Sequence, residues 1–168
     1  MSAPVRAAAK IVDLDEAARR VTEWRASGLV TVLANGVFDL LHVGHVRFLA
    51  GARAHGDRLI VAVNADAATA ALKGPGRPVM AAGDRAALVA ALRVVDLVVI
   101  FAAPTVDGLI EALAPDVHAK GTDYRVDTVP ERETMRARGG ATVITGDAKS
   151  HASRELVERI RARANEAS

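Results

Sequence analysis

Short apolar runs alternate with longer amphipathic segments along most of the chain, and this alternation constrains the fold more than any other feature. The apolar runs are bounded by turn-forming residues, which is typical of strands that are covered on both faces. The runs lie at 29–34, 58–63, 97–101, 116–119 and 141–145, and the predicted helices lie at 14–25, 43–55, 84–92, 105–113, 130–138 and 153–164. The sequence therefore predicts an α/β fold: a doubly wound, Rossmann-like, five-stranded parallel sheet with helices on both faces.

The first 28 residues are expected to form a loose tail, at 2–10, followed by the first helix. Asp13 and Glu16 have the spacing of a capping box at the start of this helix, and Gly28 stands where a glycine commonly ends one. A chain of 168 residues has room for a single domain of ordinary size. We therefore divide it into an N-terminal tail and helix, 1–28, and one domain, 29–168, whose ligands are expected beyond the carboxyl ends of the strands.

The composition excludes several classes of function. The chain has 22 Lys and Arg against 20 Asp and Glu, a net charge of +2, so it lacks the basic excess of most nucleic-acid-binding proteins. It has no cysteine, which excludes disulfides, thiolate catalysis and zinc sites built on sulfur. The longest apolar runs are far shorter than the ~20 residues of a membrane span, and the N-terminus lacks the apolar run of a signal peptide. We expect a cytoplasmic protein with no nucleic-acid partner and no membrane partner.

The segment that follows the first predicted strand, 35–45, carries the strongest chemical signal. His42 and His45 are three residues apart, so they share one face at the start of the next helix, and Gly44 leaves space above that face. Free N–H groups and the positive end of the helix dipole make such a helix start a natural site for phosphate. Two imidazoles there can donate to phosphate oxygens and stabilise charge that builds in a transition state. The alternative is that both histidines are surface or capping residues.

The same segment, Asn-Gly-Val-Phe-Asp-Leu-Leu-His-Val-Gly-His, resembles the signature of the cytidylyltransferase-like nucleotidyltransferases. The resemblance covers most of the chain, from about residue 29 to residue 160. Segments at 56–66, 72–74, 77–78 and 120–124 are similar to those of the D-glycero-β-D-manno-heptose 1-phosphate adenylyltransferases, which make ADP-heptose alone or as one half of a bifunctional protein with a sugar kinase. Leu-Lys-Gly at 72–74 and Lys-Gly-Thr-Asp-Tyr at 120–124 favour this branch, because the signature alone is shared with transferases of other small phosphates.

The resemblance implies that a sugar 1-phosphate attacks the α-phosphorus of ATP and that pyrophosphate leaves. The attacking phosphate is already ionised at neutral pH, so the reaction requires no general base, and catalysis consists of positioning and charge stabilisation. Mg²⁺ is expected to be held by the phosphates of ATP and by water, and we assign it no protein ligand. A homodimer or a larger homo-oligomer is also implied.

The candidate site residues lie after the strands and in the glycine-rich segments. We assign catalysis to His42, His45 and Lys73, nucleotide binding to Asn35, Gly36, Phe38, Asp39, Lys120, Gly121, Asp123 and Ser153, and sugar phosphate binding to Asn64, Asp66, Arg77 and Arg85. Four of them have a plainer alternative: Lys73 as a solvated loop lysine, Asp39 as a residue that orients its loop, Asp66 as a helix cap, and Arg85 as half of an ordinary salt bridge.

Two segments depart from the family's pattern. The hydroxyl cluster that usually precedes the last helix is Ala152-Ser153-Arg154 here, so only Ser153 keeps a hydroxyl, and Arg154 either contacts the anion or points to solvent. Val37 stands where relatives often carry Cys or Thr. Two alternatives therefore stay open. One is a cytidylyltransferase acting on glycerol 3-phosphate or a similar small phosphate, and the other is a non-catalytic nucleotide-binding module.

Overall fold

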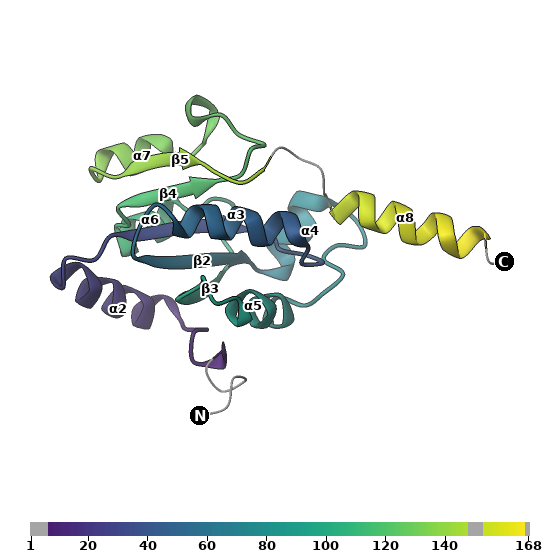
Figure 1. Cartoon of the computed structure of the whole chain (residues 1–168), viewed down its shortest axis with the longest axis horizontal. Helices are drawn as coiled ribbons and strands as arrows, with labels where there is room; N and C mark the ends of the chain where they lie inside the picture. Colours follow the sequence, from purple (N-terminus) through teal and green to yellow (C-terminus); the bar gives the residue numbers. More distant parts are fainter. Residues whose placement is uncertain (1–6, 148–152, 167–168) are drawn as a thin grey trace.

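A five-stranded parallel sheet forms the centre of the protein (Figure 1). The computed structural model describes residues 7–147 and 153–166, without the side chains of 153–155 and 165–166. The strand order is β3-β2-β1-β4-β5, and each neighbouring pair is parallel. The predicted sheet is confirmed, with most strand ends shifted by one or two residues. The strands are β1 (Thr31–Gly36), β2 (Arg58–Asn64), β3 (Leu97–Phe101), β4 (Val117–Lys120) and β5 (Ala141–Ile144).

Helices cover both faces of this sheet (Figure 1). Successive residues of a strand face opposite sides, so Val32 belongs to a core cluster with α3 and α5, and Leu33 to a second cluster with α2 and α6. The predicted doubly wound arrangement is therefore confirmed. The helices are α2 (Leu14–Ala26), α3 (Val43–Arg53), α4 (Asp66–Lys73), α5 (Ala82–Ala91), α6 (Asp107–Leu113), α7 (Arg132–Ala137) and α8 (Ser153–Glu166), with a 3₁₀ turn η1 (Val126–Thr128) before α7.

The N-terminal region packs onto the domain. The Asp13 side chain accepts a hydrogen bond from the Glu16 N–H at 2.8 Å, which caps the first turn of α2 as the spacing predicted. Val21 on the same helix is buried in the core. Before the helix, Ile11 forms a parallel bridge with Val98 on the outer edge of β3. The Lys10 carbonyl accepts a hydrogen bond from the Val98 N–H at 2.8 Å, so the last residue of the predicted loose tail is held at a strand edge that would otherwise be open.

The helix α4 has no counterpart in the sequence prediction, which placed Lys73 in a loop. Lys73 is instead the last residue of this eight-residue helix. Alanine, the residue with the highest helix propensity, makes up much of α4. The helix ends at Gly74, whose φ of +87° favours glycine. The consequence for the site is that the Lys73 backbone is fixed while its side chain stays exposed.

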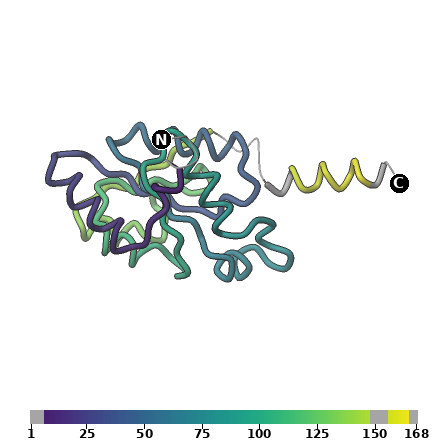
Figure 2. Tube along the Cα trace, turned by 90° about the horizontal axis from the view of Figure 1, so that it is seen from below, coloured from purple at the N-terminus to yellow at the C-terminus, as the bar shows by residue number. Residues whose placement is uncertain are grey.

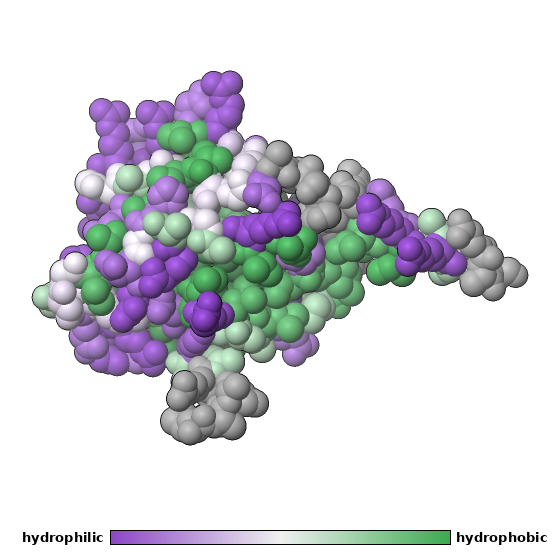
Figure 3. Space-filling model, viewed as in Figure 1, coloured by the Kyte–Doolittle hydropathy of each residue, from purple (hydrophilic) through white to green (hydrophobic). Residues whose placement is uncertain are grey.

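The last helix, α8, projects from the domain, in the view of Figure 1 and in the view from below (Figure 2). It confirms the helix predicted at 153–164. On the face that carries α3 and α5, apolar side chains gather between the two helices (Figure 3). Val43 and Val46 of α3 and Leu88 of α5 are exposed apolar residues. Among the helices that the structure describes, none has both the length and the apolar character needed to cross a membrane.

Candidate active site

A cavity of about 790 Å³ opens at the carboxyl ends of the strands. It lies where the strand order reverses, between β1 and β4, which is the usual position for a ligand in a doubly wound sheet. Asn35 and Gly36 at the end of β1, Asn64 at the end of β2, the start of α3 and the loop after β4 form its wall. The fold therefore provides a space of ligand size at the edge of the sheet that the sequence indicated.

His42 and His45 hold each other in place at the start of α3. His42 caps the helix, because its Nδ1 accepts a hydrogen bond from the Gly44 N–H at 3.1 Å. The His42 N–H in turn donates to Nδ1 of His45 at 3.3 Å, and the two rings stack with their centroids 3.9 Å apart. An Nδ1 that accepts carries no proton, so the proton of each neutral ring is on Nε2. The Nδ1 atoms thus do the capping, while both rings line the cavity and keep Nε2 as a donor.

His45 is neutral at physiological pH. Burial contributes most to lowering its pKa, and the nearby His42 and Lys73 side chains help to bring the pKa to about 4, while the charge of Asp39 opposes them. The edge of the Phe38 ring packs against the imidazole, with centroids 5.4 Å apart. The ring is therefore a hydrogen-bond donor held in a fixed place, rather than a permanent cation.

Asp39 anchors the loop between β1 and α3. Its buried carboxylate accepts hydrogen bonds from the Val79 N–H at 3.0 Å and the Met80 N–H at 3.1 Å, and it pairs with Arg77 at 2.5 Å. Burial raises the pKa of Asp39, but these donors together outweigh burial and hold the pKa below 3.8. Its neighbour Phe38 is buried with a left-handed φ of 52°. The geometry favours the loop-orienting role for Asp39, because the anchored loop maintains this uncommon conformation.

Arg85 makes its contacts inside the protein. Its fully buried guanidinium donates to the Met80 carbonyl at 2.9 Å and to the Val37 carbonyl at 2.6 Å. It also donates to the Asp66 carboxylate at 2.7 Å. The described residues that line the cavity include neither Arg85 nor Asp66. The salt-bridge alternative therefore accounts for an arginine at the start of α5, and the structure does not bring these two residues into the cavity wall.

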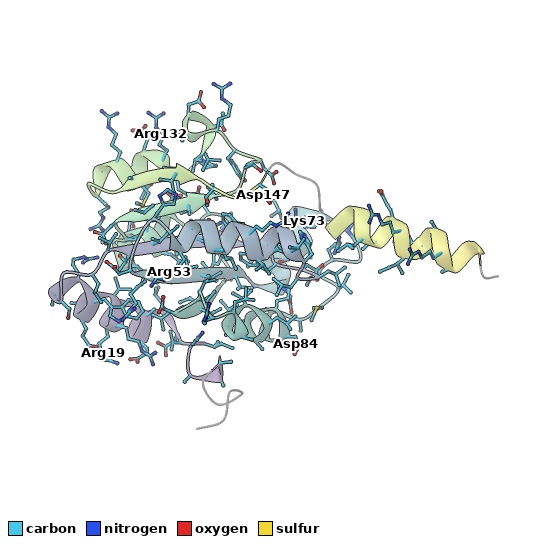
Figure 4. The ribbon with its side chains drawn as sticks, viewed as in Figure 1. Arg19, Arg53, Lys73, Asp84, Arg132 and Asp147 are labelled. Atoms are coloured by element: carbon cyan, nitrogen blue, oxygen red, sulfur yellow. The ribbon has the colours of Figure 1, made fainter. Side chains whose placement is uncertain are left out.

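Most of the other predicted residues do converge on the cavity. Lys73 and Asp147 lie at the same end of α3 (Figure 4). The predicted phosphate contact of Ser153 falls on a side chain outside the described residues, and so do the two alternatives for Arg154. The predicted residues in the cavity wall are Asn35, Gly36, Phe38, Asp39, His42, His45, Asn64, Lys73, Arg77, Lys120, Gly121 and Asp123.

Several residues of the cavity wall have no counterpart in the prediction, and three of them contact one another. Arg47 of α3 pairs with Asp147, which follows β5, at 2.9 Å. The Thr122 hydroxyl donates to the Asp147 carbonyl at 2.9 Å, so three elements meet there. The position of Asp147 after a strand was a usable signal in the sequence. The sequence held no such signal for Arg47, because only the packing of α3 beside the end of β5 brings Arg47 to the cavity wall.

A buried polar cluster lies beneath the cavity, between β1, β4 and α7. Lys120 Nζ is 3.1 Å from Asn35 Oδ1 and 3.3 Å from Glu131 Oε2. His118 Nε2 is 3.0 Å from the same Asn35 oxygen. Burial, and then the charge of Lys120, lower the pKa of His118 to about 4 against the opposing charges of Glu131 and Asp107. Lys120 is therefore paired inside the protein, and His118 and Glu131, which the sequence did not single out, belong to the support of the site.

Comparisons with known proteins agree on one family. The model of a family described as cytidylyltransferase-like matches residues 33–160. Proteins named bifunctional protein HldE, from Caulobacter sp. (strain K31) and Mesorhizobium japonicum, are 47% and 43% identical to this chain over 91% and 90% of its length. The chain spans 31% of the length of each of these relatives. A solved structure of the lipopolysaccharide core biosynthesis protein from Thermoplasma volcanium GSS1 is similar, with a TM-score of 0.62 and 27% identity, and the match covers 73% of this chain and 100% of that one.

Proposed function

The chain belongs to the cytidylyltransferase-like family of nucleotidyltransferases, and we propose that it joins ATP to D-glycero-β-D-manno-heptose 1-phosphate, giving ADP-heptose and pyrophosphate. An oxygen of the sugar phosphate attacks the α-phosphorus and forms a new P–O bond. The bond from the α-phosphorus to the oxygen that bridges to the β-phosphorus breaks, and pyrophosphate leaves with that oxygen. No proton has to move, so the protein's part is positioning and charge stabilisation.

The stacked histidine pair is the observation that carries this proposal. Each ring is fixed through Nδ1, so the Nε2–H of His42 and of His45 is already in place before a substrate arrives. Donors that are held in advance do not have to reorganise as charge builds on the oxygens of the α-phosphate, and one such donor is worth about 10²–10³ in rate. Lys73, exposed in the same cavity at the end of α4, adds a cation for the triphosphate.

The choice of heptose 1-phosphate as the acceptor is supported by two segments of the cavity wall. Leu72 and Lys73 come from the first, and Gly121, Asp123 and Tyr124 come from the second. Both segments resemble the heptose 1-phosphate adenylyltransferases, and both are in position to contact a substrate. The relatives named bifunctional, of which this chain spans 31%, support a branch in which the transferase is one part of a larger protein.

We further propose that Mg²⁺ enters with ATP, because phosphate oxygens and water satisfy its coordination. In the described ranges, no three His, Asp or Glu side chains are grouped so that they could hold a metal ion. A cytoplasmic location and a homodimer or larger homo-oligomer complete the proposal. The location rests on the composition of the sequence, and the oligomer rests on the resemblance to the family.

Pyrophosphate release tests this function directly. The protein is given D-glycero-β-D-manno-heptose 1-phosphate and Mg²⁺ with ATP, CTP, GTP or UTP in turn, and release with ATP alone is expected. Release with CTP and glycerol 3-phosphate, but not with the heptose, would establish the cytidylyltransferase alternative. ATP binding without release from any acceptor in a panel of sugar and polyol phosphates would leave the non-catalytic module.

A further inference from the structure

Asn35 is held by two neighbours through a single atom. Its Oδ1 lies 3.1 Å from Lys120 Nζ and 3.0 Å from His118 Nε2. An ammonium group only donates hydrogen bonds, so the shared atom is the carboxamide oxygen and not the nitrogen. This removes the usual ambiguity in the orientation of an asparagine side chain. The oxygen faces the buried cluster, and the NH₂ group faces away from it.

His118 has one protonation state that fits this arrangement. Because Asn35 Oδ1 accepts, Nε2 of His118 carries the proton, and Nδ1 of the neutral ring bears a lone pair. In the part of the chain that the structure describes, Nδ1 is buried without a hydrogen-bond partner, as expected for the unprotonated nitrogen. Burial and the charge of Lys120 keep the pKa of the ring near 4, so it stays neutral. His118 is thus a buried donor directed at one oxygen.

The NH₂ group of Asn35 is the part of this cluster that can reach a ligand. Asn35 lines the cavity, and none of the described residues accepts a hydrogen bond from its nitrogen. We propose that His118 is a positioning residue that, together with Lys120, orients the Asn35 carboxamide so that its NH₂ group donates to a phosphate oxygen of a bound substrate. The inference rests on the proposed function for the identity of that phosphate.

Glu131 explains how the buried Lys120 can help to orient Asn35 without leaving an unbalanced charge. Its carboxylate lies 3.3 Å from Lys120 Nζ, and both side chains are nearly fully buried, so the positive charge is balanced within the cluster. The ligand therefore meets a neutral, oriented amide from Asn35. His118 itself is fully buried and is not among the residues that line the cavity. It acts only through Asn35, which makes the dependence of one residue on the other measurable.

A double-mutant cycle tests this dependence. Titration calorimetry gives the Kd of MgATP and, separately, of D-glycero-β-D-manno-heptose 1-phosphate for the variants Asn35→Ala, His118→Leu, His118→Gln and Asn35→Ala/His118→Leu. Losing one hydrogen bond to a charged oxygen raises a Kd by about 10–100-fold, so Asn35→Ala and His118→Leu should each weaken one of the two ligands by about that factor. Glutamine keeps a donor near the place of Nε2, so His118→Gln should stay within about threefold of the wild type. The double variant should bind no more weakly than Asn35→Ala.

The ligand that weakens identifies the source of the phosphate, and either one supports the inference. Equal losses in His118→Gln and His118→Leu, or losses that add in the double variant, would overturn it. Met135→Leu, a volume-conserving change in the core on the same side of the sheet, is the control for repacking alone and should keep wild-type binding.

Two further results separate this inference from its premises. Binding is read without turnover, so a protein that binds MgATP but releases no pyrophosphate with any acceptor refutes the proposed function and leaves the cycle interpretable. If His118→Leu does not fold, the ¹⁵N shifts of the wild-type His118 ring decide. A protonated Nε2 and a bare Nδ1 at neutral pH are expected, and the opposite tautomer would overturn the inference.

Discussion

Acid should destabilise the fold, and His118 should account for a defined part of the loss. The ring is fully buried beside Lys120, and its pKa is about 4 in the folded protein against 6.5 in an unfolded chain. Below pH 6.5 the unfolded chain binds a proton at this position that the folded protein does not bind. The unfolded state is therefore stabilised relative to the folded state. Stability from this source is complete above about pH 6.5 and is lost as the pH falls toward 4.

The two pKa values set the size of the effect. A pKa lowered from 6.5 to about 4 corresponds to at most about 3 kcal/mol at pH values well below 4. At about pH 5 the unfolded chain is almost fully protonated at His118, while only about a tenth of the folded molecules are. The linkage relation then gives a loss of about 2 kcal/mol between about pH 7 and about pH 5, a large share of a typical net stability of about 5–15 kcal/mol.

The substitution His118→Gln isolates the contribution of His118 to the pH dependence of stability, because glutamine keeps a donor and does not titrate. Urea unfolding at about pH 7 and about pH 5, followed by the fluorescence of the single tryptophan, Trp24, gives the free energy of unfolding at each pH. The fall between the two pH values should be about 2 kcal/mol smaller in the variant than in the wild type, whatever its stability at pH 7. His55→Gln, at an exposed position, is the matched control and should keep the wild-type fall. An equal fall in His118→Gln and in the wild type would refute the reasoning.

Substitutions in the site and in its supports should separate catalysis from stability. His45→Ala should lower kcat by about 10²–10³ with a small change in Tm, because it removes a donor to developing charge; near-normal pyrophosphate release would contradict that role. Arg85→Lys should lower the free energy of unfolding, measured in urea, by about 2–3 kcal/mol, because one ammonium cannot replace three donors aimed at three separate oxygens. Unchanged stability would show that those hydrogen bonds contribute little. Gly56→Ala should cost about 1–3 kcal/mol, since the added Cβ would lie 2.9 Å from the Val30 carbonyl oxygen. Gly83→Ala, whose added Cβ meets no atom within 4 Å, is its control, and thermal unfolding that ranks the two alike would contradict the packing argument.

Most of the sheet could be predicted because its signal is local. The run Leu97–Phe101 is apolar at every position and β-branched at three of its five, so it is recognised as a buried strand wherever the chain places it. The helix α4 was missed for a related reason. Four of its eight residues are alanine, which favours a helix, but the segment is shorter than the window of about 11–18 residues in which a helical period is recognised. The start of α6 was placed two residues early, because nothing in the segment beginning at Thr105 marks where the turn gives way to helix.

In the candidate site, too, local relations could be predicted from the sequence and distant contacts could not. His42 and His45 could be placed together in one candidate site from the sequence, because they are three residues apart at the start of a helix. The residues before them identify the family. Pairings between distant residues were beyond that kind of argument. Asp39 meets Arg77 across 38 positions, and His118 meets Asn35 across 83, so no local pattern links them.

By itself, the sequence determined the succession of the five strands, most of the helices and the family, since each depends on residue type and short spacing. Only the tertiary structure decided which polar side chains line the cavity and which meet one another. Arg85 and Lys73 are both cations near the same loop, yet one is fully buried on internal oxygens and the other is exposed in the cavity. The physical reason is that a buried charge must find its partner within the protein, and the packing of the whole chain, not the neighbouring residues, determines where that partner lies.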